Sequence, residues 1–207
     1  MRYRRIPDET VRRLPMYLRG LLLLSEQGQQ NVSSRNLACL VSAKASQIRK
    51  DFSYFGAFGT PGVGYDINKL IRQIRKILNL GDVRKAALVG VGNLGSAILA
   101  YPGFRMYGFD IAAAFDSDPK KVGRKISRVT IENTSNLRTL RKRKIHLAIL
   151  AVPREAAQRV ADLLVKAGVK GILNFSPLRV VVPKKIKVIT IDIAMELARL
   201  PYYMPAR

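Results

Sequence analysis

The chain has 207 residues, of which 48% are hydrophobic and 25% charged, enough for one large or two small globular domains. No apolar run is long enough to cross a bilayer, and the start MRYRRIPDET lacks the apolar stretch of a secretory signal, so we expect a cytoplasmic protein with no membrane partner. The 37 Lys and Arg residues against 14 Asp and Glu residues give a net charge of +23, which favours a polyanionic partner such as nucleic acid.

Three helices are predicted in the first 56 residues. Residues 15–27 carry apolar side chains at helical spacing, and residues 32–41 follow with Ser33 or Ser34 as the N-cap. The segment KASQIRKDFSYFG (44–56) predicts a third helix with Ala45, Ile48 and Phe52 buried. This short helix, tight turn and second polar helix predict a helix-turn-helix, whose second helix suits the major groove of DNA. The DNA-facing residues that we expect on it are Lys44, Ser46, Gln47, Arg49 and Lys50.

The glycine-rich segment FGAFGTPGVGY (55–65) predicts a tight β-hairpin, the wing of a winged helix. Its glycines, Gly59 among them, can bring backbone N–H groups close to phosphates, and Tyr54 and Tyr65 offer hydroxyl contacts. Packing of the two tyrosines onto the third helix is an equally good interpretation. Residues 66–80 predict a closing amphipathic helix, so we expect a winged-helix DNA-binding domain over residues 1–81.

The next segment, KAALVGVGNLGSAILA (85–100), places Gly90, Gly92 and Gly95 where an apolar strand gives way to a helix. Gly90 permits the tight turn, Gly92 lets the backbone approach a pyrophosphate, and Gly95 lets the helix pack on the sheet. The phosphates would then face free N–H groups at a helix start. The other turn residues that we expect at the dinucleotide are Val91, Asn93 and Leu94.

An acidic residue follows at the expected distance. Asp116 closes the apolar run DIAAAFD, about 20 residues after the last glycine, where its carboxylate can accept hydrogen bonds from ribose hydroxyls. This position favours NAD(H) over NADP(H), although Lys120 and Lys121 leave the phosphorylated cofactor open.

The remainder alternates strands and helices, as a doubly wound parallel sheet requires. Ligands of such sheets bind beyond the carboxyl ends of the strands, where the chain places Val152, Pro153, Asn174 and Phe175. The predicted fold class is therefore α/β, with a winged-helix domain followed by a Rossmann-type doubly wound parallel sheet over residues 82–190. Strands are predicted at 86–90, 111–116, 145–152, 171–175 and 188–191, with a weaker one at 129–132.

The chemistry of a metal centre or of hydride transfer is poorly represented. Cys39 lies among apolar residues, where we expect it to be buried, and His146 lies in a predicted buried strand. A dehydrogenase needs a positioned acid or base beside the substrate carbon, and we find no candidate, so we expect no catalytic residue and no metal. Two alternatives stay open: a nicotinamide-dependent oxidoreductase with an accessory basic domain, and a CoA- or nucleotide-binding module that binds nucleic acid nonspecifically.

Longer motifs run through nearly the whole chain: RLPMYLRGL, QIRKDFSYFG, GVGYDINKL, VGVGNLGSAI, YPGF, FDSDPKKVG, AVPREAAQRVADLLVKAGVKGILNFSP and IDIAMELARL. Together they resemble the family of redox-sensing transcriptional repressors called Rex. The resemblance implies a homodimer that binds an inverted-repeat operator in double-stranded DNA when the cell is oxidised. It also implies that NADH binding to the Rossmann domains closes the dimer and releases the DNA.

The resemblance further implies roles for single residues. Residues 191–207 would form a C-terminal helix swapped into the partner subunit. Tyr101 of YPGF and Asp192 of IDIAMEL would lie beside the nicotinamide, and Arg19 of YLR would pair with Asp192 in one state. Two positions depart from the family pattern: Pro61, where relatives often carry a basic residue, and Ile193, where an aromatic residue often packs near the nicotinamide.

Overall fold

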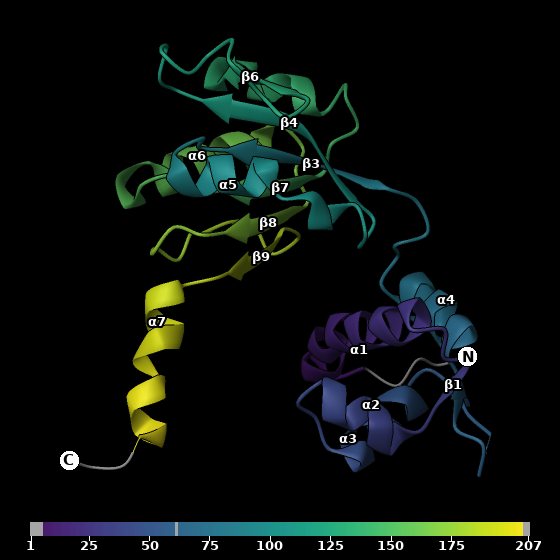
Figure 1. Cartoon of the computed structure of the whole chain (residues 1–207). Helices are drawn as coiled ribbons and strands as arrows, with labels where there is room; N and C mark the ends of the chain where they lie inside the picture. The colour runs from purple at the N-terminus through teal and green to yellow at the C-terminus, as the bar shows by residue number, and fades with distance from the viewer. Residues whose placement is uncertain (1–5, 61, 205–207) are drawn as a thin grey trace. The chain divides into compact units, whose positions relative to one another are not determined.

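The computed structural model describes residues 6–60 and 62–204. They fall into two compact units that are adjacent in sequence at Asp82 and Val83 (Figure 1). The C-terminal segment that the resemblance assigns to dimerisation belongs to the second unit. Pro61 lies outside the described residues.

The first unit consists of helices packed around one apolar core, with a short antiparallel strand pair beside them. Its core is filled by Leu14, Tyr17, Leu21, Phe52 and Ile74, all 2% exposed or less. The N-caps are Ser33, which accepts from the Asn36 N–H, and Asp66, which accepts from the Lys69 N–H. The elements are α1 (Asp8–Glu26), β1 (Asn31–Val32), α2 (Ser34–Leu40), α3 (Ala45–Ser53), β2 (Tyr65–Asp66) and α4 (Ile67–Ile77).

The first helix is longer than the sequence pattern predicts. It begins at Asp8 instead of residue 15, and Pro15 lies inside it. Thr10 and Leu14, one and two turns into the helix, are both buried, so the apolar face begins before the proline. Burial of this extra segment and the acidic first turn compensate for the hydrogen bond that Pro15 cannot donate.

The predicted wing forms a small loop. Thr60 and Gly64 exchange two backbone hydrogen bonds of 2.9 and 3.0 Å, and the returning strand β2 pairs with β1. A Cβ at Gly59 would lie 2.7 Å from the ring of Tyr65, and Gly64 has a φ of +96° with a Cβ position 2.6 Å from the Val32 carbonyl oxygen. These two glycines therefore permit close packing within the wing.

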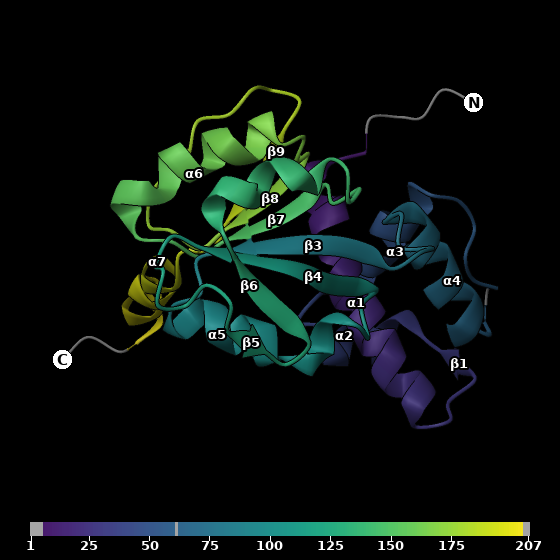
Figure 2. The same ribbon diagram turned by 90° about the horizontal axis from the view of Figure 1, so that it is seen from above.

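The second unit is the expected α/β sheet, with strand order β5-β6-β4-β3-β7-β8-β9. All neighbouring strands are parallel except the pair β5 and β6. Helix α6 packs on one face of the sheet and α5 on the other, as Figure 2 shows. The elements are β3 (Arg84–Val89), α5 (Asn93–Ala100), η1 (Pro102–Phe104), β4 (Phe109–Asp116), β5 (Lys125–Ile126), β6 (Val129–Asn133), η2 (Thr134–Leu140), β7 (Leu147–Leu150), α6 (Arg154–Lys166), β8 (Gly171–Asn174), β9 (Lys187–Thr190), α7 (Ile193–Ala198) and η3 (Leu200–Tyr203).

The structure exposes Cys39, which the sequence predicts to be buried, and His146, which the sequence places in a buried strand. Cys39 lies on the outer side of the short helix α2, which buries only Leu37 among its residues, and its Sγ faces the Arg35 carbonyl oxygen at 3.4 Å. His146 precedes β7, and its Nδ1 lies 3.2 Å from the Gly168 carbonyl oxygen. The prediction for Cys39 was wrong because α2 lies at the surface and buries only Leu37, and the predicted strand begins after His146 instead of at residue 145.

The chain leaves the sheet at β9 and continues into α7, which projects away from the strands (Figure 1). Every residue from 193 to 204 is exposed. This segment nevertheless carries large apolar side chains, with exposures from 54% to 85%, namely Ile193, Met195, Leu197, Leu200, Tyr202, Tyr203 and Met204.

Candidate dinucleotide site and DNA-facing helix

The glycine-rich turn lies between β3 and α5, and its three glycines have different surroundings. Gly90 has a φ of +93°, and a Cβ there would lie 2.3 Å from the Ala151 carbonyl oxygen. A Cβ at Gly95 would lie 2.0 Å from the Gly90 carbonyl oxygen. At Gly92, in contrast, a Cβ would meet nothing within 4 Å. Gly90 and Gly95 therefore let the backbone pack tightly, whereas Gly92 leaves open space before the first turn of α5.

Asp116, at the carboxyl end of β4, is 7% exposed and is bound to this turn. Its carboxylate accepts hydrogen bonds from the Val91 N–H at 2.8 Å, the Asp118 N–H at 2.9 Å and the Lys121 Nζ at 3.2 Å. Burial alone would raise the pKa of Asp116, but these three donors outweigh it and lower the pKa. The site thus holds a carboxylate that is ionised at neutral pH beside the glycine turn.

The next strands bring further predicted residues to the same edge of the sheet. Val89 of β3 pairs with Leu150 of β7, which pairs with Asn174 of β8, so the residues that follow these strands are neighbours. A Cβ at Gly90 would lie 2.8 Å from Val152 Cγ1, which places Val152 against the glycine turn.

The side chain of Asn174 is directed into the protein. Its amide donates to the carbonyl oxygens of Ser176 and Leu178 and to the Thr190 Oγ1, and it accepts from the Ser176 N–H. Asn174 therefore shapes the loop after β8. Of the other residues that the sequence assigns here, Asn93, Leu94 and Pro153 are exposed and Phe175 is half-buried.

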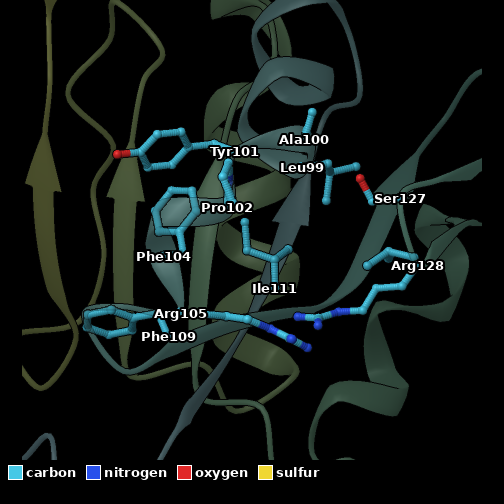
Figure 3. A pocket seen from close by; sticks show the side chains of 11 residues that line it. Leu99, Ala100, Tyr101, Pro102, Phe104, Arg105, Phe109, Ile111, Ser127 and Arg128 are labelled. Atoms are coloured by element: carbon cyan, nitrogen blue, oxygen red, sulfur yellow. The ribbon is translucent and has the colours of Figure 1, made fainter.

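Tyr101 lies elsewhere on the unit. Helix α5 runs from the carboxyl end of β3 back toward the amino ends of the strands, and Tyr101 caps its far end, with η1 leading on to the start of β4. The Tyr101 ring is 57% exposed and packs edge-to-face on Phe104 at 5.5 Å. Beside it lies a hollow of about 390 Å³, at which the guanidinium groups of Arg105 and Arg128 converge (Figure 3).

Asp192 follows β9 and caps α7 by accepting the N–H groups of Ala194 and Met195 at 3.1 and 3.2 Å. It lines a hollow of about 750 Å³ together with Thr190 and Pro177. Arg19 is exposed on α1 of the first unit. Within one chain, Asp192 is at the carboxyl end of the sheet and Tyr101 near the amino end, so the structure does not bring these two residues together.

The predicted DNA-facing helix α3 presents most of its polar side chains to solvent. Lys44, Ser46, Arg49 and Lys50 are exposed, and Arg49 Nη1 donates to Ser34 Oγ at 2.8 Å. The wing residue Gly59 is exposed, Tyr54 is half-buried, and Tyr65 is buried against Phe52 with ring centroids 5.3 Å apart. Tyr65 therefore packs the wing onto α3, which favours the packing interpretation for that residue.

Gln47 behaves differently from its neighbours on α3, because its amide Nε2 donates to Asp51 Oδ1 at 2.8 Å. Asp51 also binds Thr10, Arg13 and Tyr17 of α1. This cluster was not predicted from the sequence. The spacing of positions 10, 13 and 17, which share one face of a helix, marks the polar side chains on α1 but does not identify Asp51 as their partner.

No group of three or more His, Cys, Asp or Glu side chains that could hold a metal occurs within residues 6–60 and 62–204. None of the helices in this part of the chain is both long and apolar enough to span a membrane.

Two family models match the two units separately. The model described as "CoA binding domain" matches residues 82–178, and the one described as "Putative DNA-binding protein N-terminus" matches residues 5–53. The redox-sensing transcriptional repressor Rex of Chloroflexus aurantiacus is 47% identical over 199 residues, covering 96% of this chain and 94% of that protein. The Rex protein of Halalkalibacterium halodurans is 46% identical over 200 residues, covering 97% and 95%.

The chain also aligns with solved structures of RSP, which is described as a Rex-family repressor. The crystal structure of RSP in complex with β-NAD⁺ and operator DNA aligns with a TM-score of 0.89 at 35% identity, covering 96% of this chain and 92% of that chain. The crystal structure of RSP in complex with β-NADH aligns with a TM-score of 0.86 at 34% identity, covering 96% and 94%. The chain belongs to the Rex family of redox-sensing transcriptional repressors.

Proposed function

We propose that this protein is a DNA-binding repressor that senses the ratio of NADH to NAD⁺, bound to an inverted-repeat operator with NAD⁺ and released by NADH. The observation that carries the proposal is the open space at Gly92 beside the ionised Asp116, in a chain whose other unit presents the basic helix α3. The RSP complexes, one with β-NAD⁺ and operator DNA and one with β-NADH, support it for a protein of the same fold.

The residues around the glycine turn fit a dinucleotide. The first N–H groups of α5, from Asn93 and Leu94, have no partner within the helix and would bind the pyrophosphate across Gly92. Asp116 would accept a ribose hydroxyl, and Lys121 already neutralises part of its charge. The bound dinucleotide would supply a nicotinamide ring whose charge reports the redox state of the cell. Val152 and Pro153 would border the same edge of the sheet.

A homodimer accounts for the exposed apolar segment after β9. Apolar surface of this extent is covered in stable proteins, and a second copy of the chain is the partner that the family resemblance supplies. We therefore assign residues 1–81 to DNA binding, 82–190 to the dinucleotide and 191–207 to dimerisation through an exchanged helix. Ile193, 64% exposed, would then meet the partner subunit.

The dimer would also complete the switch. Tyr101 and Asp192 lie at opposite ends of the sheet in one chain, so a second chain is required to bring a Tyr101 and an Asp192 to the same nicotinamide. Arg19 on α1 would pair with Asp192 in one of the two states and so couple the DNA-binding helices to the cofactor. A ligand shifts such an equilibrium only by its different affinities for the two states, typically about 1–3 kcal/mol.

The experiment is a fluorescence anisotropy titration of an inverted-repeat duplex, selected from a random pool by the wild-type protein, with NADH and NAD⁺ in parallel. We expect NADH to release the duplex and NAD⁺ to leave it bound. Release by neither form would contradict the proposal. Consumption of NADH in the presence of small carbonyl compounds would support an oxidoreductase instead, and binding without sequence preference that is lost at moderate salt would support a nonspecific module.

Asp192→Asn tests the switch itself. Asparagine caps helices as well as aspartate does, so α7 keeps its cap while the charge is lost. We expect operator affinity close to wild type and a need for about 10-fold more NADH to release the DNA. Asp192→Ala, which also removes the cap, serves as the comparison for effects of helix stability alone.

A further inference from the structure

Asp51 of the first unit accepts five hydrogen bonds from side chains of two helices. Its carboxylate has no exposed surface, and it accepts hydrogen bonds from Thr10 Oγ1 at 3.0 Å, Arg13 Nε and Nη2 at 2.6 and 2.8 Å, Tyr17 OH at 2.6 Å and Gln47 Nε2 at 2.8 Å. A carboxylate offers about four lone-pair sites, so these five donors leave it no capacity for a ligand.

The donors join two helices. Thr10, Arg13 and Tyr17 lie on one face of α1 over about two turns, whereas Asp51 and Gln47 lie on α3. The ring of Tyr17 also packs edge-to-face on Phe52, with centroids 5.4 Å apart. Contacts at successive turns fix both the rotation of α3 about its axis and its position along α1.

The ionisation of the cluster is stable. Burial would raise the pKa of Asp51, but the hydrogen bonds from Arg13, Tyr17, Gln47 and Thr10 lower it to about 2. Burial raises the pKa of Tyr17, and its hydrogen bond to Asp51 adds to this, so the hydroxyl stays a donor. Around neutral pH, Asp51 is therefore ionised and Tyr17 keeps its proton.

We propose that Asp51 is a positioning residue for DNA reading, whose carboxylate fastens α3 to α1 so that the two helices present the DNA-facing side chains as one body. The inference rests on the proposed function, because it assumes that α3 meets DNA. It assigns Gln47 to positioning instead of base contact and leaves Lys44, Ser46, Arg49 and Lys50 to face the duplex.

This arrangement has a consequence for specificity. In hydrogen bonds to base edges, the donor–acceptor distance must stay within a few tenths of an ångström of its preferred value. Contacts with phosphates tolerate larger displacements and carry no sequence information. Loosening α3 should therefore weaken binding to the operator far more than binding to unrelated DNA. A displacement of α1, which carries Arg19, would likewise move the reading helix.

The test measures the affinity of full-length Asp51→Asn for the selected inverted-repeat duplex and for a scrambled duplex of equal length, both at the same salt concentration. We expect affinity for the selected duplex to fall at least about 10-fold and affinity for the scrambled duplex to change less than about 2-fold. The matched control is Asp162→Asn, because Asp162 accepts from Gln158 four residues earlier on the exposed face of α6, as Asp51 does from Gln47 on α3.

Milder variants keep the test decisive if Asp51→Asn does not fold. Tyr17→Phe and Thr10→Val each remove one donor, and we expect each to lower the ratio of selected to scrambled affinity about 2- to 5-fold. Ile74→Val, a buried change in α4, destabilises the unit without touching Asp51 and should leave that ratio unchanged.

Gln47→Ala separates positioning from base reading. If Gln47 acts through Asp51, the losses from Gln47→Ala and Asp51→Asn are not additive, and the preferred base at every operator position stays that of wild type. A relaxed preference at one base pair in Gln47→Ala would overturn the assignment. So would a folded Asp51→Asn protein, or the two milder variants, with a wild-type affinity ratio. A wild-type protein without sequence preference would instead refute the proposed function itself.

Discussion

Asp51 in the first unit and Asp116 in the second are the two carboxylates buried within residues 6–60 and 62–204, and they are held differently. Asp51 takes all five hydrogen bonds from side chains, two of them from one guanidinium. Asp116 takes two from backbone N–H groups and one from Lys121. Because a carboxylate has about four lone-pair sites, Asp51 is saturated while Asp116 can accept one more donor. The first carboxylate fastens helices, and the second can fasten a turn and still bind a ligand.

The largest effect should come from neutralising the saturated carboxylate. Asp51→Asn leaves the Arg13 guanidinium, 25% exposed, without its charged partner, and we expect the free energy of unfolding of the first unit to fall by about 3–5 kcal/mol. Asp116→Asn keeps an amide oxygen for a backbone N–H, so the second unit should lose only about 1–2 kcal/mol. Hydrogen exchange in urea, followed by mass spectrometry, measures each unit separately. Equal losses of unfolding free energy in Asp51→Asn and Asp116→Asn would contradict the proposed difference between the two carboxylates.

The pH dependence of the unfolding free energy should reveal the ionisation of Asp51. Because the pKa of Asp51 is lowered from 3.8 to about 2, its ionised form contributes stability that is complete above about pH 4 and is lost as the pH falls through 2. The difference in unfolding free energy between wild type and Asp51→Asn should therefore shrink by about 2 kcal/mol between pH 5 and pH 2. Comparing the two proteins removes the effect of their other titrating groups. A constant difference would mean that the pKa of Asp51 is the same in the folded and unfolded protein.

The two carboxylates also differ in how far the sequence can predict them. Asp116 follows the glycine turn at a fixed spacing on consecutive strands, so a local motif identifies it and its place at the edge of the sheet. Four of the five hydrogen bonds to Asp51 come from residues that lie 34 to 41 positions earlier in the chain. These residues lie on α1, which begins earlier than the apolar pattern predicts. Pairings over such distances are set by helix packing, which no local spacing encodes.

Similar reasoning explains the other differences between prediction and structure. The strands and helices of the sheet follow from alternating apolar segments, and the family resemblance confirms that fold. The side-chain directions of Asn174 and Gln47 do not follow from sequence position, because each amide turns toward groups that the fold places behind it. Tyr101 follows the glycine helix in sequence and lies at its far end, so its assignment to the nicotinamide rests on the family resemblance and stays a prediction.

The open space at Gly92 allows a test of dinucleotide binding at the glycine turn of the second unit. In Gly92→Ala the new methyl group meets no protein atom within 4 Å, so the fold should be unchanged while the dinucleotide loses its closest approach. We expect NADH affinity, measured by calorimetry, to fall at least about 10-fold, or about 1.4 kcal/mol. Gly81→Ala, which also adds a methyl group in open space, is the control and should bind NADH as wild type does. Unchanged affinity in Gly92→Ala would place the pyrophosphate elsewhere.

The smallest effect should come from Lys121, whose ammonium lies 3.2 Å from Asp116 and whose side chain is 35% exposed. Partly exposed ion pairs contribute little, and Asp116 keeps its two backbone donors, so Lys121→Met should lower the unfolding free energy of the second unit by less than about 1 kcal/mol. Arg13→Met in the first unit is the counterpart and should lower it several times more, because Asp51 would lose two of its five hydrogen bonds and the charge of the Arg13 guanidinium. If the two substitutions had equal effects, Asp116 would depend on a cation as Asp51 does, and its remaining capacity for a ribose hydroxyl would lose its physical basis.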